Sequence, residues 1–73
     1  MKIRLCHHSR QRLVSRRIKV KDIKIALQNI TATVPAKKRG RHKICGKVND
    51  KLLWVIHEIR KNNSYFVITA YWA

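Results

Sequence analysis

The 73-residue chain carries 18 Lys and Arg against three Asp and Glu, and its formal net charge at pH 7 is +15. An excess of this size predicts a polyanionic partner, with RNA favoured, whereas a hydrophobic content of 45% excludes a disordered basic tail. The length fits a single domain over residues 1–73. No segment approaches the ~18 apolar residues of a membrane span, so we expect no membrane partner. The two cysteines imply no disulfide framework, and we therefore expect a cytoplasmic protein.

A short strand and two helices are predicted in the first half of the chain. Lys2–Leu5 alternate between charged and apolar side chains, which is the period of a strand. Residues 7–17 contain no Gly or Pro and carry a narrow apolar stripe, and a second helical pattern begins at Val20, with Asp22 near its positive N-terminal end. The residues that these helices are expected to bury are Leu13, Val14, Ile18, Val20, Ile23, Leu27 and Ile30.

The second half of the chain is predicted to form β-structure. Residues 31–34 are β-prone, and Pro35 ends this run or marks a sheet edge. A charged loop over residues 37–43 runs into a strand, and tight turns at Asn49-Asp50 and Asn62-Asn63 separate the β-prone runs that follow. The predicted fold class is therefore α+β, with an N-terminal strand, two helices on one side, and three or four mostly antiparallel strands.

The last strand is predicted to have two distinct faces. One face consists of Phe66, Ile68, Ala70 and Trp72, and the other of Tyr65, Val67, Thr69 and Tyr71. We assign Trp54, Phe66 and Trp72 to the core. Tyr65 and Tyr71 then share a face, where they either stack on unpaired bases or bury their rings and hydrogen-bond their hydroxyls.

Three side chains in the first helix have the spacing of one helical stripe. His8, Arg12 and Arg16 are four residues apart, so neighbouring side chains lie roughly 6 Å from each other. Arginine grips phosphate oxygens in a bidentate way and stays charged at working pH. The stripe is therefore a candidate phosphate site, and the alternative is a solvated basic face.

A second basic cluster lies in the loop before the central strands. Its Gly40 would let backbone amides approach a phosphate beside the charged side chains. A solvated loop of a basic protein is an equally good interpretation. The candidate nucleic-acid-binding residues are Lys37, Lys38, Arg39, Arg41 and Lys43.

Neither a metal site nor a cofactor is expected. Possible ligands are Cys6, His7, His8, His42 and Cys45, but their spacing fits no zinc module, and Cys6 is expected to lie on a strand whose neighbours point the other way. Two-metal phosphoryl chemistry needs a carboxylate cluster, and the three acids are scattered along the chain.

Two groups of residues resemble a small bacterial family, domain of unknown function 4258 (DUF4258). Its opening pattern is matched by the segment His8-Ser9-Arg10-Gln11-Arg12 with Arg16, followed by residues 20–23. Gly40-Arg41, Gly46 and the closing residues 67–71 resemble its second half. Ser9 replaces the Ala that is usual in the family, and Ser15 replaces a Glu.

The resemblance carries expectations about fold and function. The family is similar to the RelE, ParE and BrnT toxins, which place helices on one side of a small antiparallel sheet. RelE-like members are metal-independent ribonucleases made beside an acidic antitoxin, whereas ParE-like members act on DNA gyrase. The resemblance therefore implies a RelE-like toxin domain with an acidic antitoxin partner.

A metal-independent ribonuclease needs a base, an acid and cations around the phosphorane that forms when the 2′-hydroxyl attacks the adjacent phosphate. The assigned roles are His8 or Tyr71 as general base, Arg12 and Arg16 as transition-state cations, Arg41 with Lys43 as substrate grip, and His57, in an apolar strand, as a weaker candidate acid. The alternatives are a nucleic-acid-binding module without catalysis and a toxin-like protein whose basic face receives an acidic antitoxin.

Overall fold

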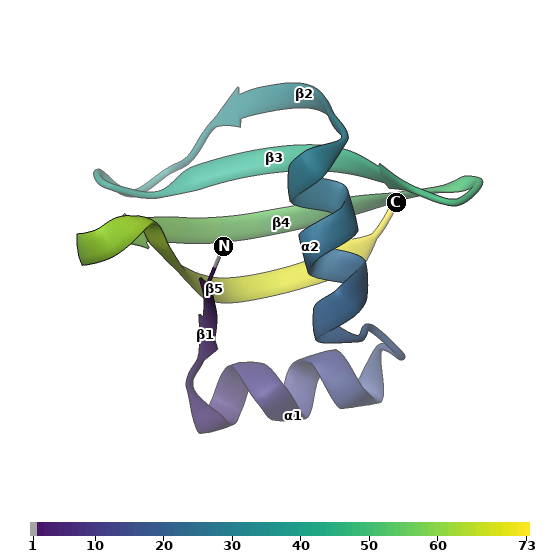
Figure 1. The fold of residues 1–73 in the computed structure, drawn as a ribbon, viewed down its shortest axis with the longest axis horizontal. Coiled ribbons are helices and arrows are strands. Elements are labelled where there is room, and N and C mark those ends of the chain that lie inside the picture. Colours follow the sequence, from purple (N-terminus) through teal and green to yellow (C-terminus); the bar gives the residue numbers. More distant parts are fainter. Residues whose placement is uncertain (1) are drawn as a thin grey trace.

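The structure, a computed structural model that describes residues 2–73, is an open five-stranded sheet with two helices (Figure 1). The elements are β1 (Lys2–Leu5), α1 (His7–Ser15), α2 (Val20–Gln28), β2 (Ile30–Pro35), β3 (His42–Val48), β4 (Lys51–Arg60), a 3-10 turn (Lys61–Asn63) and β5 (Ser64–Trp72). The strand order is β1-β5-β4-β3-β2, and the β1–β5 pair is parallel while the other pairs are antiparallel. The predicted α+β class is confirmed; four strands follow the helices, and β1 adds a fifth.

Both predicted turns join neighbouring antiparallel strands. Asn49 in the β3–β4 turn has a φ of 56°, and Asn62 and Asn63 before β5 have φ values of 61° and 57°. Asparagine tolerates this left-handed region better than other residues with a Cβ. Pro35 closes β2, which is an edge strand of the sheet as its proline indicates.

Helix α2 crosses one face of the sheet and supplies much of the core (Figure 1). Ile23, Ala26 and Leu27 are buried against the strands, and Asp22 accepts a hydrogen bond from the backbone N–H of Lys19 at 2.9 Å, which satisfies a donor at the helix start. Helix α2 approaches β3 closely at Gly46, where an added Cβ would overlap the backbone of Ala26. Glycine is therefore required at this position.

Three residues expected in the core are exposed. Val14 is 77% exposed because the inner side of α1 carries Ser9 and Leu13 instead. Val20 starts α2 and is exposed, and Ile30 lies in the edge strand β2 rather than in a helix.

No helix within residues 2–73 is long and apolar enough to cross a membrane.

Cys6 is not a strand residue, which corrects the sequence-based expectation. It is the N-cap of α1, and its Sγ accepts a hydrogen bond from the backbone N–H of Ser9 at 3.4 Å. Capping satisfies one of the donors left open at a helix start.

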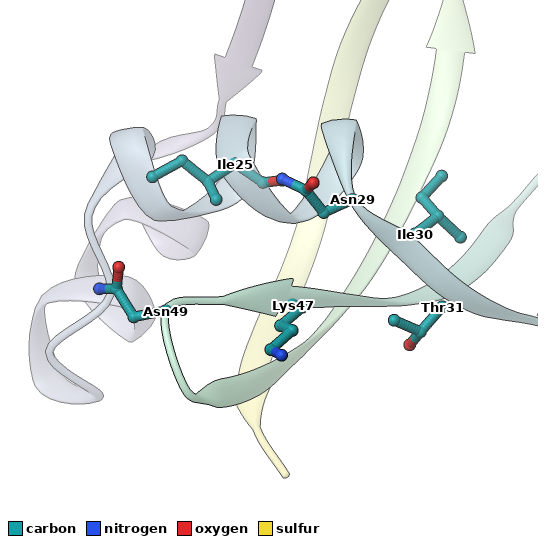
Figure 2. A pocket seen from close by; sticks show the side chains of 6 residues that line it. All are labelled: Ile25, Asn29, Ile30, Thr31, Lys47 and Asn49. Carbon is teal, nitrogen blue, oxygen red and sulfur yellow. The ribbon is translucent and has the colours of Figure 1, made fainter.

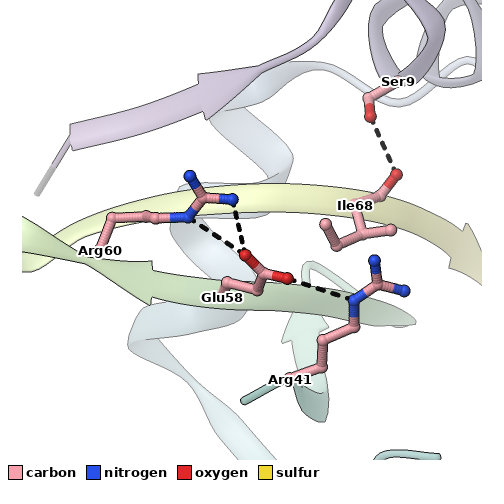
Figure 3. Close-up of polar contacts among 5 residues, drawn as sticks. All are labelled: Ser9, Arg41, Glu58, Arg60 and Ile68. Atoms are coloured by element: carbon pink, nitrogen blue, oxygen red, sulfur yellow. Dashed lines mark hydrogen bonds and ion pairs between the residues drawn. The ribbon is translucent and has the colours of Figure 1, made fainter. Parts of the chain in front are cut away.

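Helix α1 runs along the β5 edge of the sheet (Figure 1). Strand β1 pairs with β5 only as far as Val67. Beyond that point the Ser9 hydroxyl donates to the Ile68 carbonyl at 2.9 Å, and Arg16 Nη1 donates to the Ala70 carbonyl at 3.0 Å (Figure 3 shows the Ser9 bond). Side chains of α1 and of Arg16, its C-cap residue, therefore occupy hydrogen-bonding groups that an edge strand otherwise presents to solvent.

A register shift in the β4–β5 pair reverses which residues of β5 face the helices. Ile56 pairs with Thr69 but His57 pairs with Val67, so Ile68 has no partner in β4. Val67 and Ala70, three residues apart, are consequently both buried on the helix side. The predicted strict alternation along β5 is therefore wrong.

Candidate nucleic-acid interface

One face of the sheet packs against the helices, and within residues 2–73 no helix packs on the other, which we call the uncovered face. Register places Trp54 and Phe66 there, half-buried, so their assignment to the core is wrong; Trp72 does pack against the core. Tyr71 shares the uncovered face, whereas the register shift puts Tyr65 on the helix side. Other residues of the uncovered face include Arg4, Val34, Lys43, Cys45, Leu52, Ile56, Glu58 and Thr69.

A row of side chains crosses the uncovered face from β2 to α1. Val34, Lys43, Ile56 and Thr69 are successive cross-strand partners. At the end of the row, Arg16 Nη1 donates to Thr69 Oγ1 at 2.9 Å. Adjacent strands are about 4.8 Å apart, so the backbones of Lys43 and Thr69 lie about 10 Å from each other. The fold thus brings Arg16 and Lys43 to the same part of the sheet although they are distant in sequence.

A pair of aromatic rings lies beside this row. Trp54 and Tyr71 are cross-strand partners, and Lys43 Nζ lies 5.0 Å from the Trp54 ring centroid and 5.8 Å from that of Tyr71. A cation–π contact at an exposed site contributes about 0.5–1 kcal/mol. Lys43 is therefore held weakly and is free to exchange this contact for a phosphate.

A basic groove of about 580 Å³ lies where the uncovered face meets the loop over residues 36–41. Its cations come from the loop and from β3, and its apolar surface comes from β2, the loop and β4. The lining residues are Lys37, Lys38, Arg41 and Lys43, with Val34, Pro35, Ala36 and Ile56. Arg39 is exposed in the same loop. Lys43 and Ile56 belong both to the groove and to the row that leads to Thr69.

Glu58 lies on the uncovered face between two arginines (Figure 3). Its Oε1 accepts from Arg60 Nη2 at 2.7 Å and its Oε2 accepts from Arg41 Nε at 3.3 Å. These hydrogen bonds, first from Arg60 and then from Arg41, lower the pKa of the Glu58 carboxyl below its usual value. The Arg60 guanidinium also lies 4.5 Å from the Phe66 ring centroid. Glu58 therefore orients Arg41 at the edge of the groove.

Two of the predicted catalytic residues lie farther from this region. His8 and Arg12 are exposed on α1. At 1.5 Å per residue, His8 is about 12 Å from Arg16 along the helix axis. The structure brings Arg16 and Tyr71 together around Thr69, and it leaves His8 at the other end of α1.

A second hollow, of about 440 Å³, lies between the end of α2 and the β2–β3 edge (Figure 2). It contains a single cation, Lys47, and the amide of Asn29 already donates to the Ile25 carbonyl at 2.9 Å. Ile30, Thr31 and Asn49 complete its lining. Its charge suits a polyanion less well than the basic groove does.

A histidine pair lies on the helix side of the sheet. His57 is 3% exposed, and its Nδ1 has no hydrogen-bond partner within residues 2–73. Its ring stacks on that of His42, with centroids 5.5 Å apart, and the tilted ring of Tyr65 lies 5.1 Å away, centroid to centroid. Burial, and then the nearby His42, lower the pKa of His57. Its burial was expected, but its side chain faces away from the groove and Tyr71. Across the described part of the chain, no three His, Cys, Asp or Glu side chains gather as metal ligands.

Sequence reasoning missed Trp54 and Glu58 as members of the site. Residues 52–56 form a continuous apolar run, so their periodicity does not reveal which side chains face solvent. Glu58 did offer a signal, because a carboxylate near the end of an apolar strand in a chain with three acids needs a specific partner.

Comparisons with known proteins agree with this fold. Among solved structures, the chain is similar to the crystal structure of the Brucella abortus ribonuclease toxin BrnT, with a TM-score of 0.76, 22% sequence identity, and coverage of 100% of this chain and 96% of that one. At this identity the likeness establishes the fold alone. No curated protein matches the chain. The family model for domain of unknown function (DUF4258) matches residues 6–72, nearly the whole length, and this chain therefore belongs to the DUF4258 family.

Proposed function

We propose that this protein binds RNA on its uncovered face and cleaves it as a metal-independent ribonuclease of the toxin type. The observation that carries the proposal is the convergence of Arg16 and Lys43 on the Thr69–Tyr71 part of β5. Similarity to a fold that serves a ribonuclease toxin in Brucella abortus supports it. The formal net charge of +15 supports a polyanionic substrate.

The proposed chemistry uses the RNA's own nucleophile. The 2′-hydroxyl attacks the adjacent phosphorus, the bond to the 5′-oxygen breaks, and the products are a 2′,3′-cyclic phosphate and a 5′-hydroxyl. Tyr71 accepts the 2′-hydroxyl proton, with His8 as the alternative base, and solvent at this open surface protonates the 5′-oxygen. Arg16, assisted by Arg12, stabilises the charge that develops on the phosphorane.

In this proposal the basic groove binds the flanking phosphates. Arg41 and Lys43 grip the strand nearest to Tyr71, and the loop cations Lys37 and Lys38 extend the contact. Because Lys43 lies both in the groove and over the Tyr71 ring, a phosphate held by Lys43 is positioned beside the proposed base.

Cleavage in EDTA tests the proposal. We expect the purified protein to cut a mixed set of messenger RNAs with EDTA present, and Tyr71→Phe to lower the rate by about 100-fold or more. Tyr65→Phe is the matched control, because Tyr65 lies on the helix side and should leave the rate unchanged. Intact RNA in EDTA, or full activity in both Tyr71→Phe and His8→Ala, would show the mechanism to be wrong.

A binding module without catalysis is the second candidate. The observation that favours it is that the fold already uses two of the proposed arginines: Arg16 bonds to Thr69 and Ala70, and Arg41 bonds to Glu58. The same assay separates the two functions, because a binding module retains RNA in a filter or gel-shift experiment at every time point without producing cyclic phosphate ends.

The charge excess also supports an acidic protein partner of the antitoxin kind. Co-expression with a short acidic protein encoded beside this one tests the idea. We expect the two to co-purify and the complex to lose RNA binding. An acidic neighbour that neither co-purifies nor competes with RNA contradicts this partner.

A further inference from the structure

We infer that the Trp54–Tyr71 ring pair is a stacking site for unpaired bases, so that the substrate class is single-stranded RNA and not duplex. The inference deepens the proposed function and rests on it for the presence of RNA on the uncovered face. It assigns to Trp54, which takes no part in the proposed chemistry, the role of a base-binding residue.

The position of the pair supports this role. Trp54 and Tyr71 are half-buried cross-strand partners on a face that no helix within residues 2–73 covers. The core on the other side of the sheet is filled at this point, since Val55 and Ala70, the neighbours of these residues on the helix side, are both fully buried. The rings are thus held on a packed sheet while their outer surfaces meet solvent. Stacking of bases on such aromatics tolerates any base sequence, because every base has a π-face.

Lys43 links base stacking to phosphate binding. Its ammonium lies over both rings, at 5.0 and 5.8 Å from their centroids, and it also lines the basic groove. A phosphate in the groove draws this ammonium away and uncovers the ring surfaces. Base–aromatic stacking is stronger than a cation–π contact at an exposed site, so the exchange favours the bound strand.

The geometry discriminates against duplexes. Bases inside a duplex stack on one another and present only their edges in the grooves, so they cannot lie on Trp54. A single strand can turn its bases onto the rings while its phosphates remain near Lys43 and Arg41. Phosphate contacts alone would bind both forms.

Fluorescence of Trp54 tests the inference directly. The chain has two tryptophans, so Trp72→Phe leaves Trp54 as the sole tryptophan. We expect a ten-nucleotide single strand, 2′-O-methylated to prevent cleavage, to quench its emission in a saturable way at low salt. Inorganic polyphosphate should bind without comparable quenching, and a duplex of the same composition should bind about tenfold more weakly.

Variants at Trp54 provide the second measurement. Trp54→Leu should weaken binding of the single strand by about tenfold and leave polyphosphate binding unchanged, whereas Trp54→Phe should retain most of the affinity. Leu52→Ala, at an exposed apolar residue two positions away on β4, is the matched control and should change the affinity less than twofold.

The outcomes separate the inference from the proposed function. If the single strand binds but Trp54 emission stays constant, or if duplex and single strand bind equally well, base stacking is overturned while phosphate binding and cleavage stand. If neither nucleic acid binds at low salt, the proposed function and the inference both fail.

Discussion

Arg16 illustrates how one side chain serves both the fold and the candidate site. Its guanidinium donates to Thr69 Oγ1 and to the Ala70 carbonyl, and its own carbonyl accepts a hydrogen bond from Trp72 Nε1 at 3.2 Å. Arg12, one turn earlier on the same stripe, is exposed as Arg16 is, but its side chain makes no hydrogen bond within residues 2–73. The two arginines lie on the same helical stripe in the sequence, but they have different roles in the structure.

This difference predicts unequal effects on stability. Arg16→Met should lower the free energy of unfolding by about 1–2 kcal/mol, because two hydrogen bonds to β5 are lost. Arg12→Met should change it by less than about 0.5 kcal/mol, as is usual for exposed positions. Urea denaturation monitored by circular dichroism measures both. Equal losses in the two variants would mean that Arg16 does not secure the β5 edge.

His57 predicts how stability depends on pH. Burial and His42 lower its pKa in the folded protein, so the unfolded chain binds a proton more readily. The free energy of unfolding should therefore fall as the pH drops below about 6.5, the ordinary value of histidine, and continue to fall until the pH reaches the folded pKa. Urea denaturation between pH 7.5 and 5 measures this slope.

Variants identify the group that is responsible. His57→Phe keeps an aromatic ring between His42 and Tyr65 but cannot titrate, and it should flatten the pH dependence. A slope that survives in His57→Phe would assign the pH dependence to another group.

At the scale of elements, the approach of α2 to β3 depends on Gly46. Gly46→Ala should destabilise the protein by about 3 kcal/mol, because the added methyl overlaps the backbone of Ala26 and neither main chain can move aside without disturbing the core. Gly40→Ala should cost about 1 kcal/mol, from its φ of +81° alone, since its surroundings are open. Thermal unfolding compares them, and a smaller loss at Gly46 would mean that α2 is free to shift.

Element types were predictable because they depend on local patterns. The alternation in β1, the helical spacing in α2, and the asparagine turns before β4 and β5 are each encoded within a few residues. The end of α1 was less predictable. Arg17 adopts a φ of 57°, and the backbone N–H of Ile18 donates to the Leu13 carbonyl at 2.9 Å. Ile18 is therefore buried in the core, whereas Val14 faces solvent.

At the scale of the whole molecule, charge should dominate nucleic-acid binding. If about six phosphates are engaged, affinity for RNA should fall about a thousandfold between 50 and 200 mM salt, because each neutralised phosphate releases counterions. The basic groove, Arg16 and the cations of α1 offer this many contacts. Titration of an uncleavable RNA at several salt concentrations measures the slope, and a flat response would contradict the polyanion partner.

The sequence by itself determined the α+β class and the order of the elements, because local periodicity survives any folding of the chain. Its charge excess is likewise independent of the fold, and it is the basis on which we propose a polyanionic partner. Only the tertiary structure decided which side chains lie on the uncovered face, where we propose that this partner binds. Ile68 is unpaired in β4, so Tyr65 turns to the core and Tyr71 stays on the uncovered face with Trp54. On one side β5 pairs with β4, and on the other it pairs with β1 and accepts hydrogen bonds from Ser9 and Arg16. These partners are distant from β5 or fixed only by the fold, and no local pattern in β5 encodes the shift.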